Sequence, residues 1–142
     1  MKIKIKKLHA DAKMPTRGTS GAAAFDLYAS ETVGLPSSRA AKIPTGIAME
    51  IPEGYCGMIY TRSSSPIRGL QVHTTVVDSD YRGELFITVN VMPGVYDAPT
   101  KVDAGERVAQ LRIEKVEDVH FEWSDTLSQT ERGAGGYGST GR

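Results

Sequence analysis

The feature that most constrains the fold of this chain is a series of short runs rich in β-branched and aromatic residues. Each run ends within a few residues at Gly, Pro or Asp, which interrupt strands. No stretch has a long helical period, and residues 63–69 could form at most one short helix. The pattern predicts an all-β fold, a distorted jelly roll or β-barrel. Strands are expected at residues 2–8, 40–49, 55–61, 70–77, 84–91 and 107–116.

The chain has 142 residues, which is enough for one domain with a real core but too short for two comfortable ones. We therefore expect a β-barrel domain over residues 1–131 and a separate Gly-rich C-terminal segment over residues 132–142. No internal repeat is present, and no linker precedes residue 132.

Charge and hydropathy exclude two classes of partner. Seventeen basic and seventeen acidic residues cancel without forming blocks of like charge, so binding to a nucleic-acid backbone is not expected. No apolar run is long enough to span a bilayer, and no signal-peptide core is evident, so no membrane partner is expected. Cys56 is the only cysteine, which rules out an intrachain disulfide framework and favours the cytoplasm.

The segment 132–142 is unusual because five of its eleven residues are glycine and only Tyr137 offers a sizeable apolar surface. It cannot bury enough area to offset its ordering entropy, so by itself it should be flexible. Its unhindered backbone N–H groups, two hydroxyls and two guanidinium groups are suited to clamping a polyphosphate. A lid over a phosphorylated, ring-bearing ligand and a frayed terminus are equally compatible with this composition.

Four further segments carry more polar residues than strands require. Asp26, between Phe25 and Leu27, is either a hydrogen-bonded structural carboxylate or a cation ligand, and the structural role is favoured. Arg62 precedes three serines that could bracket phosphate oxygens, although serine-rich turns are common. Asp78 and Asp80 flank a predicted tight turn, where Asp often serves the backbone alone.

The fourth segment, Gly-Glu-Arg-Val-Ala-Gln, ends at Gln110, just inside a predicted strand. In order and spacing, the five polar segments resemble the five motifs of the trimeric dUTP pyrophosphatase (dUTPase) family. The resemblance covers almost the whole chain, and its third and fifth motifs are highly specific. The motif sequences in this chain are Ala-Phe-Asp-Leu-Tyr, Arg-Ser-Ser, Val-Asp-Ser-Asp-Tyr-Arg-Gly-Glu, Gly-Glu-Arg-Val-Ala-Gln and Arg-Gly-Ala-Gly-Gly-Tyr-Gly-Ser-Thr-Gly.

The resemblance implies hydrolysis of dUTP to dUMP and pyrophosphate through attack of water on the α-phosphorus. Asp78 matches the carboxylate that activates the water. Tyr81 matches the aromatic residue that packs on the deoxyribose and leaves no room for a 2′-hydroxyl. The pyrimidine would be recognised by the backbone of residues 70–78, where His73, Thr75 and Val77 lie.

The resemblance also implies a triphosphate site with a Mg²⁺ ion chelated by the phosphates. Asp26 would contact this ion, through water, because Mg²⁺ keeps most of its hydration shell. The residues expected to bind substrate phosphates are Arg62, Ser63, Ser64 and Gln110. The substrate-binding residues expected from the C-terminal lid are Arg132, Gly135, Gly136, Tyr137, Ser139 and Thr140, with Tyr137 stacked over the uracil.

Members of this family are homotrimers in which each active site draws motifs from all three subunits. Their activity limits uracil incorporation into DNA and supplies dUMP for dTMP synthesis. The dCTP deaminases share the fold but need a Glu where this chain has Thr88, so hydrolysis is favoured over deamination. A regulatory nucleotide-binding member is a further alternative, although Asp78 and the glycine-rich motif are both intact.

Several positions depart from the family pattern, among them Ser65-Pro66 in the second motif and Tyr137, where the family usually has Phe. Ala24 and Thr75 stand where the family usually has glycine. A side chain at residue 75 bears on the shape of the expected uracil pocket.

Overall fold

The computed structural model describes residues 1–136 of the chain and is almost entirely made of β-strands, with one four-residue helix in that range. The all-β prediction is therefore confirmed. In chain order the elements are β1 (Lys4–Lys7), β2 (Phe25–Tyr28), β3 (Val33–Gly34), β4 (Ala41–Pro44), β5 (Ile47–Glu50), β6 (Tyr55–Thr61), α1 (Ser64–Ile67), β7 (Leu70–Val72), β8 (Thr75–Val77), β9 (Phe86–Val91), β10 (Lys101–Val102) and β11 (Arg107–Lys115).

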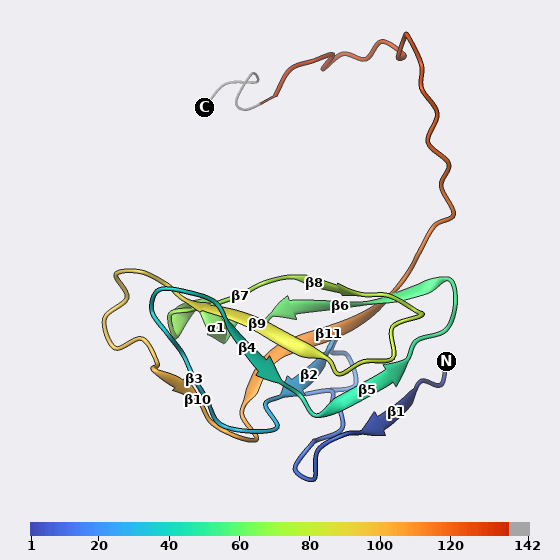
Figure 1. The fold of residues 1–142 in the computed structure, drawn as a ribbon. Coiled ribbons are helices and arrows are strands. Elements are labelled where there is room, and N and C mark those ends of the chain that lie inside the picture. Colours follow the sequence, from blue (N-terminus) through green and yellow to red (C-terminus); the bar gives the residue numbers. More distant parts are fainter. Residues whose placement is uncertain (137–142) are drawn as a thin grey trace.

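The strands form two larger sheets and two short strand pairs, all antiparallel. One sheet has the order β2-β11-β6-β8 and the other has the order β4-β9-β7. The strand pairs β1-β5 and β3-β10 lie beside them in the body of the molecule (Figure 1). The sheets enclose one core because alternate residues of each strand point inward.

The alternation is clearest in β9 and β1. In β9, Ile87 and Val89 are fully buried, whereas Phe86 and Thr88 on the other face are half-buried. In β1, Ile5 packs against the core while the lysines are exposed, as the sequence pattern predicts. The largest fully buried hydrophobic side chains come from both larger sheets, from the segment before β9 and from β10: Leu27, Ile43, Ile59, Leu70, Leu85, Ile87, Val89 and Val102.

Two of the predicted strands are each divided in two. Residues 40–49 form β4 and β5, which belong to different sheets, because the chain turns at Gly46 with φ +68°. A Cβ at Gly46 would lie 2.8 Å from the Cβ atoms of Ala12 and His9, so the position requires glycine. Residues 70–77 divide at His73, where β7 leaves β9 and β8 joins β6.

The sequence prediction missed β2, β3 and β10. In β2 an aspartate interrupts the apolar alternation, and β3 and β10 pair over only two residues each. Strands this short depend on tertiary contacts more than on local propensity.

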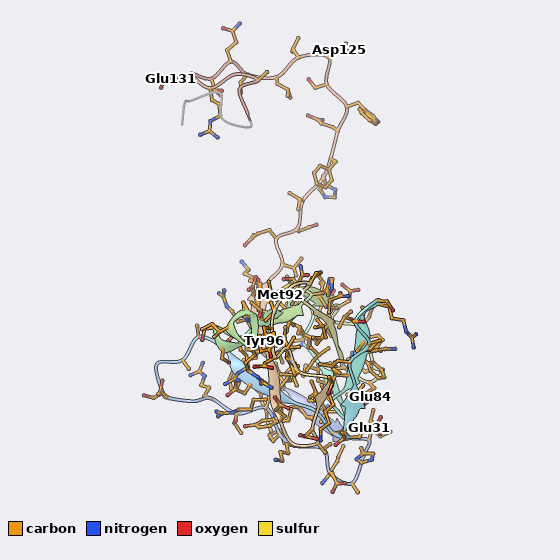
Figure 2. All side chains as sticks on the ribbon, turned by 90° about the vertical axis from the view of Figure 1, so that its left-hand side faces the viewer. Glu31, Glu84, Met92, Tyr96, Asp125 and Glu131 are labelled. Carbon is orange, nitrogen blue, oxygen red and sulfur yellow. The ribbon has the colours of Figure 1, made fainter. Side chains whose placement is uncertain are left out.

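The segment that follows β11 extends away from the body of the molecule as an arm (Figures 1 and 2). We call residues 116–136 the arm; they contain no helix or strand. Its apolar side chains are exposed, with Phe121 at 96%, Trp123 at 104% and Leu127 at 88%. Among residues 1–136, no helix combines the length and hydropathy needed to cross a membrane.

Candidate active site

A groove opens where the two larger sheets separate. β8 is an edge strand, and β9 pairs with β7 only from Val89 to Val91. The last backbone hydrogen bond between the β7–β8 segment and β9 runs from the His73 N–H to the Thr88 carbonyl, at 2.9 Å. Beyond it the edges of β8 and β9 face a cavity of about 280 Å³. The groove is lined by Lys42, Ile59, Thr75, Val76, Val77, Asp78, Tyr81, Glu84, Leu85, Phe86 and Thr88.

The groove contains the carboxylate and the ring expected from the third motif. Asp78 follows β8 directly and is exposed. Its carbonyl accepts a 3.2 Å hydrogen bond from the Tyr81 N–H, which closes the turn. The Tyr81 hydroxyl donates to the Glu84 carbonyl at 2.9 Å, and this bond fixes the ring while leaving it 44% exposed. A ring held by its own hydroxyl offers a flat, preorganised surface.

Of the three other residues expected around the pyrimidine, two line the groove and one does not. Thr75 lines the groove and is half-buried, and Val77 lines it and is buried. His73 does not line the groove; its Nε2 atom lies 2.5 Å from Asn90 Oδ1 on the neighbouring strand. The structure thus brings Thr75, Val77, Asp78 and Tyr81 together and leaves His73 at the point where the strands diverge.

A second polar cluster, which we call the arginine cluster, is built around Asp26, Arg62 and Arg107. Arg62 Nε donates to Asp26 Oδ1 at 2.9 Å, and Arg107 Nη1 donates to Asp26 Oδ2 at 3.4 Å. The Asp26 side chain is only 14% exposed. Arg62 Nη1 also donates to the Arg107 carbonyl at 3.3 Å. One carboxylate therefore fixes two guanidinium groups, which are suited to binding phosphate oxygens.

The hydroxyl and amide groups expected near the phosphates lie beside this cluster. Ser64 Oγ accepts a 3.4 Å hydrogen bond from Arg62 Nη1. Ser63 is the N-cap of α1, and its side chain forms no capping hydrogen bond. Gln110 is the register partner of Asp26, and its amide donates to the Thr61 carbonyl at 2.7 Å. The structure therefore gathers Asp26, Arg62, Ser64 and Gln110 in one region, with Ser63 next to it in the chain.

Arg107 was not among the residues predicted from the sequence. It lies in the Gly-Glu-Arg turn that precedes Gln110. Because it is 81 positions away from Asp26, the sequence alone does not indicate that the two side chains meet. Its position in the fourth motif is the sequence signal from which it could have been predicted.

Asp78 and the arginine cluster lie toward opposite ends of β6. Val77 pairs with Gly57, so Asp78 lies beside Cys56, whereas Arg62 is six positions further along. At a strand rise of about 3.3 Å per residue, their backbones are roughly 20 Å apart. Arg62 also turns away from β8, because its partner Asp26 lies on β2 at the far edge of the sheet. Asp78 and Arg62 of one chain therefore cannot reach the same phosphorus atom.

The described residues do not form a metal cage of their own. No group of three His, Cys, Asp or Glu side chains converges within residues 1–136. Both carboxylate oxygens of Asp26 are already engaged by arginines. Asp26 therefore does not fit direct coordination of Mg²⁺, and its position between two cations supports a structural role.

Only part of the expected lid falls within the described residues. Arg132, Gly135 and Gly136 lie in the arm, where Gly135 N–H donates to the Arg132 carbonyl at 3.0 Å. Tyr137, Ser139 and Thr140 lie outside the described residues.

The chain is thus an antiparallel β-protein with two polar sites: a carboxylate at an open sheet edge and a separate, preorganised arginine cluster. Comparison with known proteins gives the family. The dUTPase family model matches residues 10–141, and the chain belongs to the dUTPase family.

Curated relatives and solved structures agree with this assignment. The chain is 39% identical to the deoxyuridine 5′-triphosphate nucleotidohydrolase of Corynebacterium diphtheriae, over 98% of this chain and 92% of the relative. It is 40% identical to the enzyme of the same name from Kluyveromyces lactis, over 99% and 94% of the two chains. It is similar in structure to the Staphylococcus bacteriophage 80alpha dUTPase with dUPNHPP, with a TM-score of 0.89, 29% identity and 99% coverage of both chains.

Proposed function

We propose that the protein is a dUTP diphosphatase that hydrolyses dUTP to dUMP and pyrophosphate. The observation that carries this proposal is the pairing of Asp78 with the fixed Tyr81 ring in the groove between β8 and β9. Relatives that span nearly the whole chain carry the corresponding enzyme name. In a cell this activity would limit uracil incorporation into DNA and supply dUMP for dTMP synthesis. We place it in the cytoplasm, which the single free Cys56 favours.

The groove would hold the nucleoside. The edges of β8 and β9 present main-chain N–H and C=O groups to it, and these groups match the donors and acceptors of a uracil edge. The Tyr81 ring would pack against the deoxyribose and exclude a 2′-hydroxyl. Asp78 would accept a proton from the water that attacks the α-phosphorus, and general-base assistance of this kind is worth about 100- to 10,000-fold in rate.

The arginine cluster would hold the phosphates. Arg62 and Arg107 supply positive charge, while Ser63, Ser64 and Gln110 supply neutral hydrogen-bonding groups. Asp26 keeps both guanidinium groups in place before the substrate arrives, which reduces the ordering cost of binding. A Mg²⁺ ion bound to the triphosphate would neutralise charge on the transferred group.

The Gly-rich segment would close over the bound nucleotide as a lid. Arg132, Ser139 and Thr140 would contact the phosphates, the backbone at Gly135 and Gly136 would allow close approach, and Tyr137 would cover the uracil. Closure would exclude water and strengthen the charge interactions inside the site.

We infer that the working enzyme is a homotrimer with shared active sites. The separation of Asp78 from Arg62 along β6 supports this, because one chain cannot present both to one triphosphate. The arm supports it as well, since Phe121, Trp123 and Leu127 find no cover in their own chain within residues 1–136. A neighbouring copy would supply that cover and receive the lid.

Deamination of dCTP is not supported by the groove. The position at which a deaminase needs its carboxylate is occupied by Thr88, which lines the groove. Among the described residues, Glu84 is the glutamate that lines the groove, and its Oε1 atom already accepts the Gly46 N–H at 2.8 Å. Within residues 1–136, no glutamate is therefore free at this position to act as the general acid and base for proton transfer at the pyrimidine C4.

One assay tests the proposal. The purified protein is incubated with Mg²⁺ and dUTP, dCTP or UTP, and pyrophosphate and ammonia are followed separately. We expect pyrophosphate from dUTP alone and ammonia from none of the three. Ammonia release from dCTP, or equal turnover of UTP and dUTP, would refute the assignment.

A further inference from the structure

The groove contains a cation that no motif explains. Lys42 lies on β4 and is the register partner of Thr88 on β9. Its neighbours Ala41 and Ile43 are buried, so Lys42 points to the outer face of the sheet, where Phe86 and Thr88 also lie. The Lys42 side chain lines the same cavity as Asp78 and Tyr81.

The direction of the Lys42 side chain is set by an aromatic ring. Lys42 Nζ lies 3.7 Å from the centre of the Phe86 ring, which places the ammonium over the ring face. This contact holds the ammonium beside the groove, although Lys42 remains exposed to solvent. Within residues 1–136, none of the ion pairs involves Lys42, so no carboxylate neutralises it.

An ammonium group has three donors and no acceptor. It can donate to a carbonyl oxygen, but it repels an amino group presented at the same place. Uracil and cytosine differ at ring position 4 in this respect, because uracil carries a carbonyl oxygen there and cytosine carries an amino group.

We infer that Lys42 is a specificity-determining residue that donates a hydrogen bond to the 4-oxo group of the pyrimidine. This inference rests on the proposed function, because it requires the base to occupy the groove between β8 and β9. Lys42 then adds a charged side-chain contact to recognition by the strand backbones. Thr75 on β8 and Phe86 on β9 line the same cavity, so a base in the groove would lie beside the ring that holds the Lys42 ammonium.

The test compares two substrates on three proteins. The substrates are dUTP and the 2′-deoxyribonucleoside triphosphate of pyrimidin-2-one, an analogue that lacks the 4-oxygen and, with it, the N3 proton; its low wild-type turnover is the reference against which each variant is compared. The proteins are the wild type, Lys42→Met and Lys7→Met; Lys7 is an exposed β1 lysine outside the groove and serves as the matched control. kcat/KM and the Kd of the non-hydrolysed α,β-imido forms are measured.

We expect Lys42→Met to lose about 10- to 100-fold in kcat/KM for dUTP, the cost of a hydrogen bond to a charged group. Turnover of the 4-deoxy analogue should stay within a few-fold of its wild-type value, since it has no oxygen to bind. Lys42→Arg should restore part of the loss, and Lys7→Met should behave as the wild type. The dUTP-to-dCTP preference should fall in Lys42→Met.

An equal loss for dUTP and the analogue would show that Lys42 serves the phosphates or Asp78, and would overturn the inference. Unchanged dUTP binding in Lys42→Met would also overturn it. Failure of the wild type to hydrolyse dUTP would refute the proposed function, which separates the two outcomes. If Lys42→Met does not fold, Lys42→Gln takes its place, because a neutral polar side chain suits an exposed strand position. Its turnover of dUTP should fall while its turnover of the analogue stays near the wild-type value, and equal changes for both substrates would overturn the inference.

Discussion

The groove and the arginine cluster differ in how firmly the protein holds their charged side chains before a ligand binds. Asp78 lies exposed on a turn after a three-residue edge strand, and the groove around it is open. In the arginine cluster, Asp26 is largely buried, holds two guanidinium groups and sits within a continuous four-stranded ladder. The proposed phosphate-binding groups are therefore already organised in the isolated chain, whereas the proposed catalytic carboxylate would depend on a nucleotide, and on neighbouring chains, to complete its surroundings.

The largest difference between the regions should appear when each loses its carboxylate. Asp78→Asn keeps the shape of the side chain but removes the base, so we expect kcat to fall by about 100- to 10,000-fold. Binding of a non-hydrolysed dUTP analogue, measured by calorimetry, should change little. A comparable loss of affinity would show that Asp78 has a structural role instead.

Removal of residues 132–142 should affect both regions together. A truncated chain loses the proposed lid, and misplacement of the reacting groups costs on the order of 100-fold in turnover. Steady-state pyrophosphate release measures this effect. Circular dichroism and the sedimentation of the truncated chain should match those of the full chain, because the core described by the structure is built from residues 3–113. Normal turnover would argue for a frayed terminus.

The sequence predicted the core of the fold better than the site geometry. Residues 55–61 form one strand as predicted, because a run of aromatic and aliphatic residues directly after Gly54 defines it locally. By contrast, the divisions at Gly46 and His73 depend on which sheet each half joins, and local pattern does not carry that information.

Because local sequence carries little information on strand pairing, it also predicted only some of the contacts in the site. Asp78 and Tyr81 are three residues apart, so their meeting follows from a turn that the sequence shows. The contacts of Asp26 with Arg62 and Arg107 join three strands, so the sequence pointed to Asp26 and Arg62 but not to Arg107 or to the contacts among them. Lys42 carries no motif, and its place at the groove appears only once β4 and β9 are paired.

Asp26→Asn tests whether preorganisation of the arginines matters. The neutral amide weakens two charge-assisted contacts, so we expect KM for dUTP to rise by roughly 10-fold or more, with a smaller change in kcat. Titration with Mg²⁺ at saturating dUTP is the second measurement, and its midpoint should stay near the wild-type value. A large shift of that midpoint with unchanged KM would instead place Asp26 at the metal. Arg107→Lys is the companion variant, and it should reproduce the rise in KM.

The smallest effect is expected at Thr75. Replacement by Gly, the usual residue of the family at this position, removes a side chain from the groove but keeps the strand backbone that faces the base. KM for dUTP should change by no more than about 10-fold, while the free energy of unfolding should fall by about 0.5–1 kcal/mol, the cost of glycine in a strand. Denaturant unfolding and initial rates measure both. A complete loss of binding would assign base recognition to the Thr75 side chain.

The most direct test of the account is complementation between two inactive chains. Asp78→Asn and Arg62→Gln chains are each shown to be folded and inactive, then unfolded, mixed in equal amounts and refolded together. If every site takes residue 78 from one chain and residue 62 from another, random assembly restores both native groups in about a quarter of the sites. The account predicts recovery of dUTP hydrolysis to about that fraction of the wild-type rate. Co-assembled oligomers that remain inactive would show that both groups act within one chain, and would contradict it.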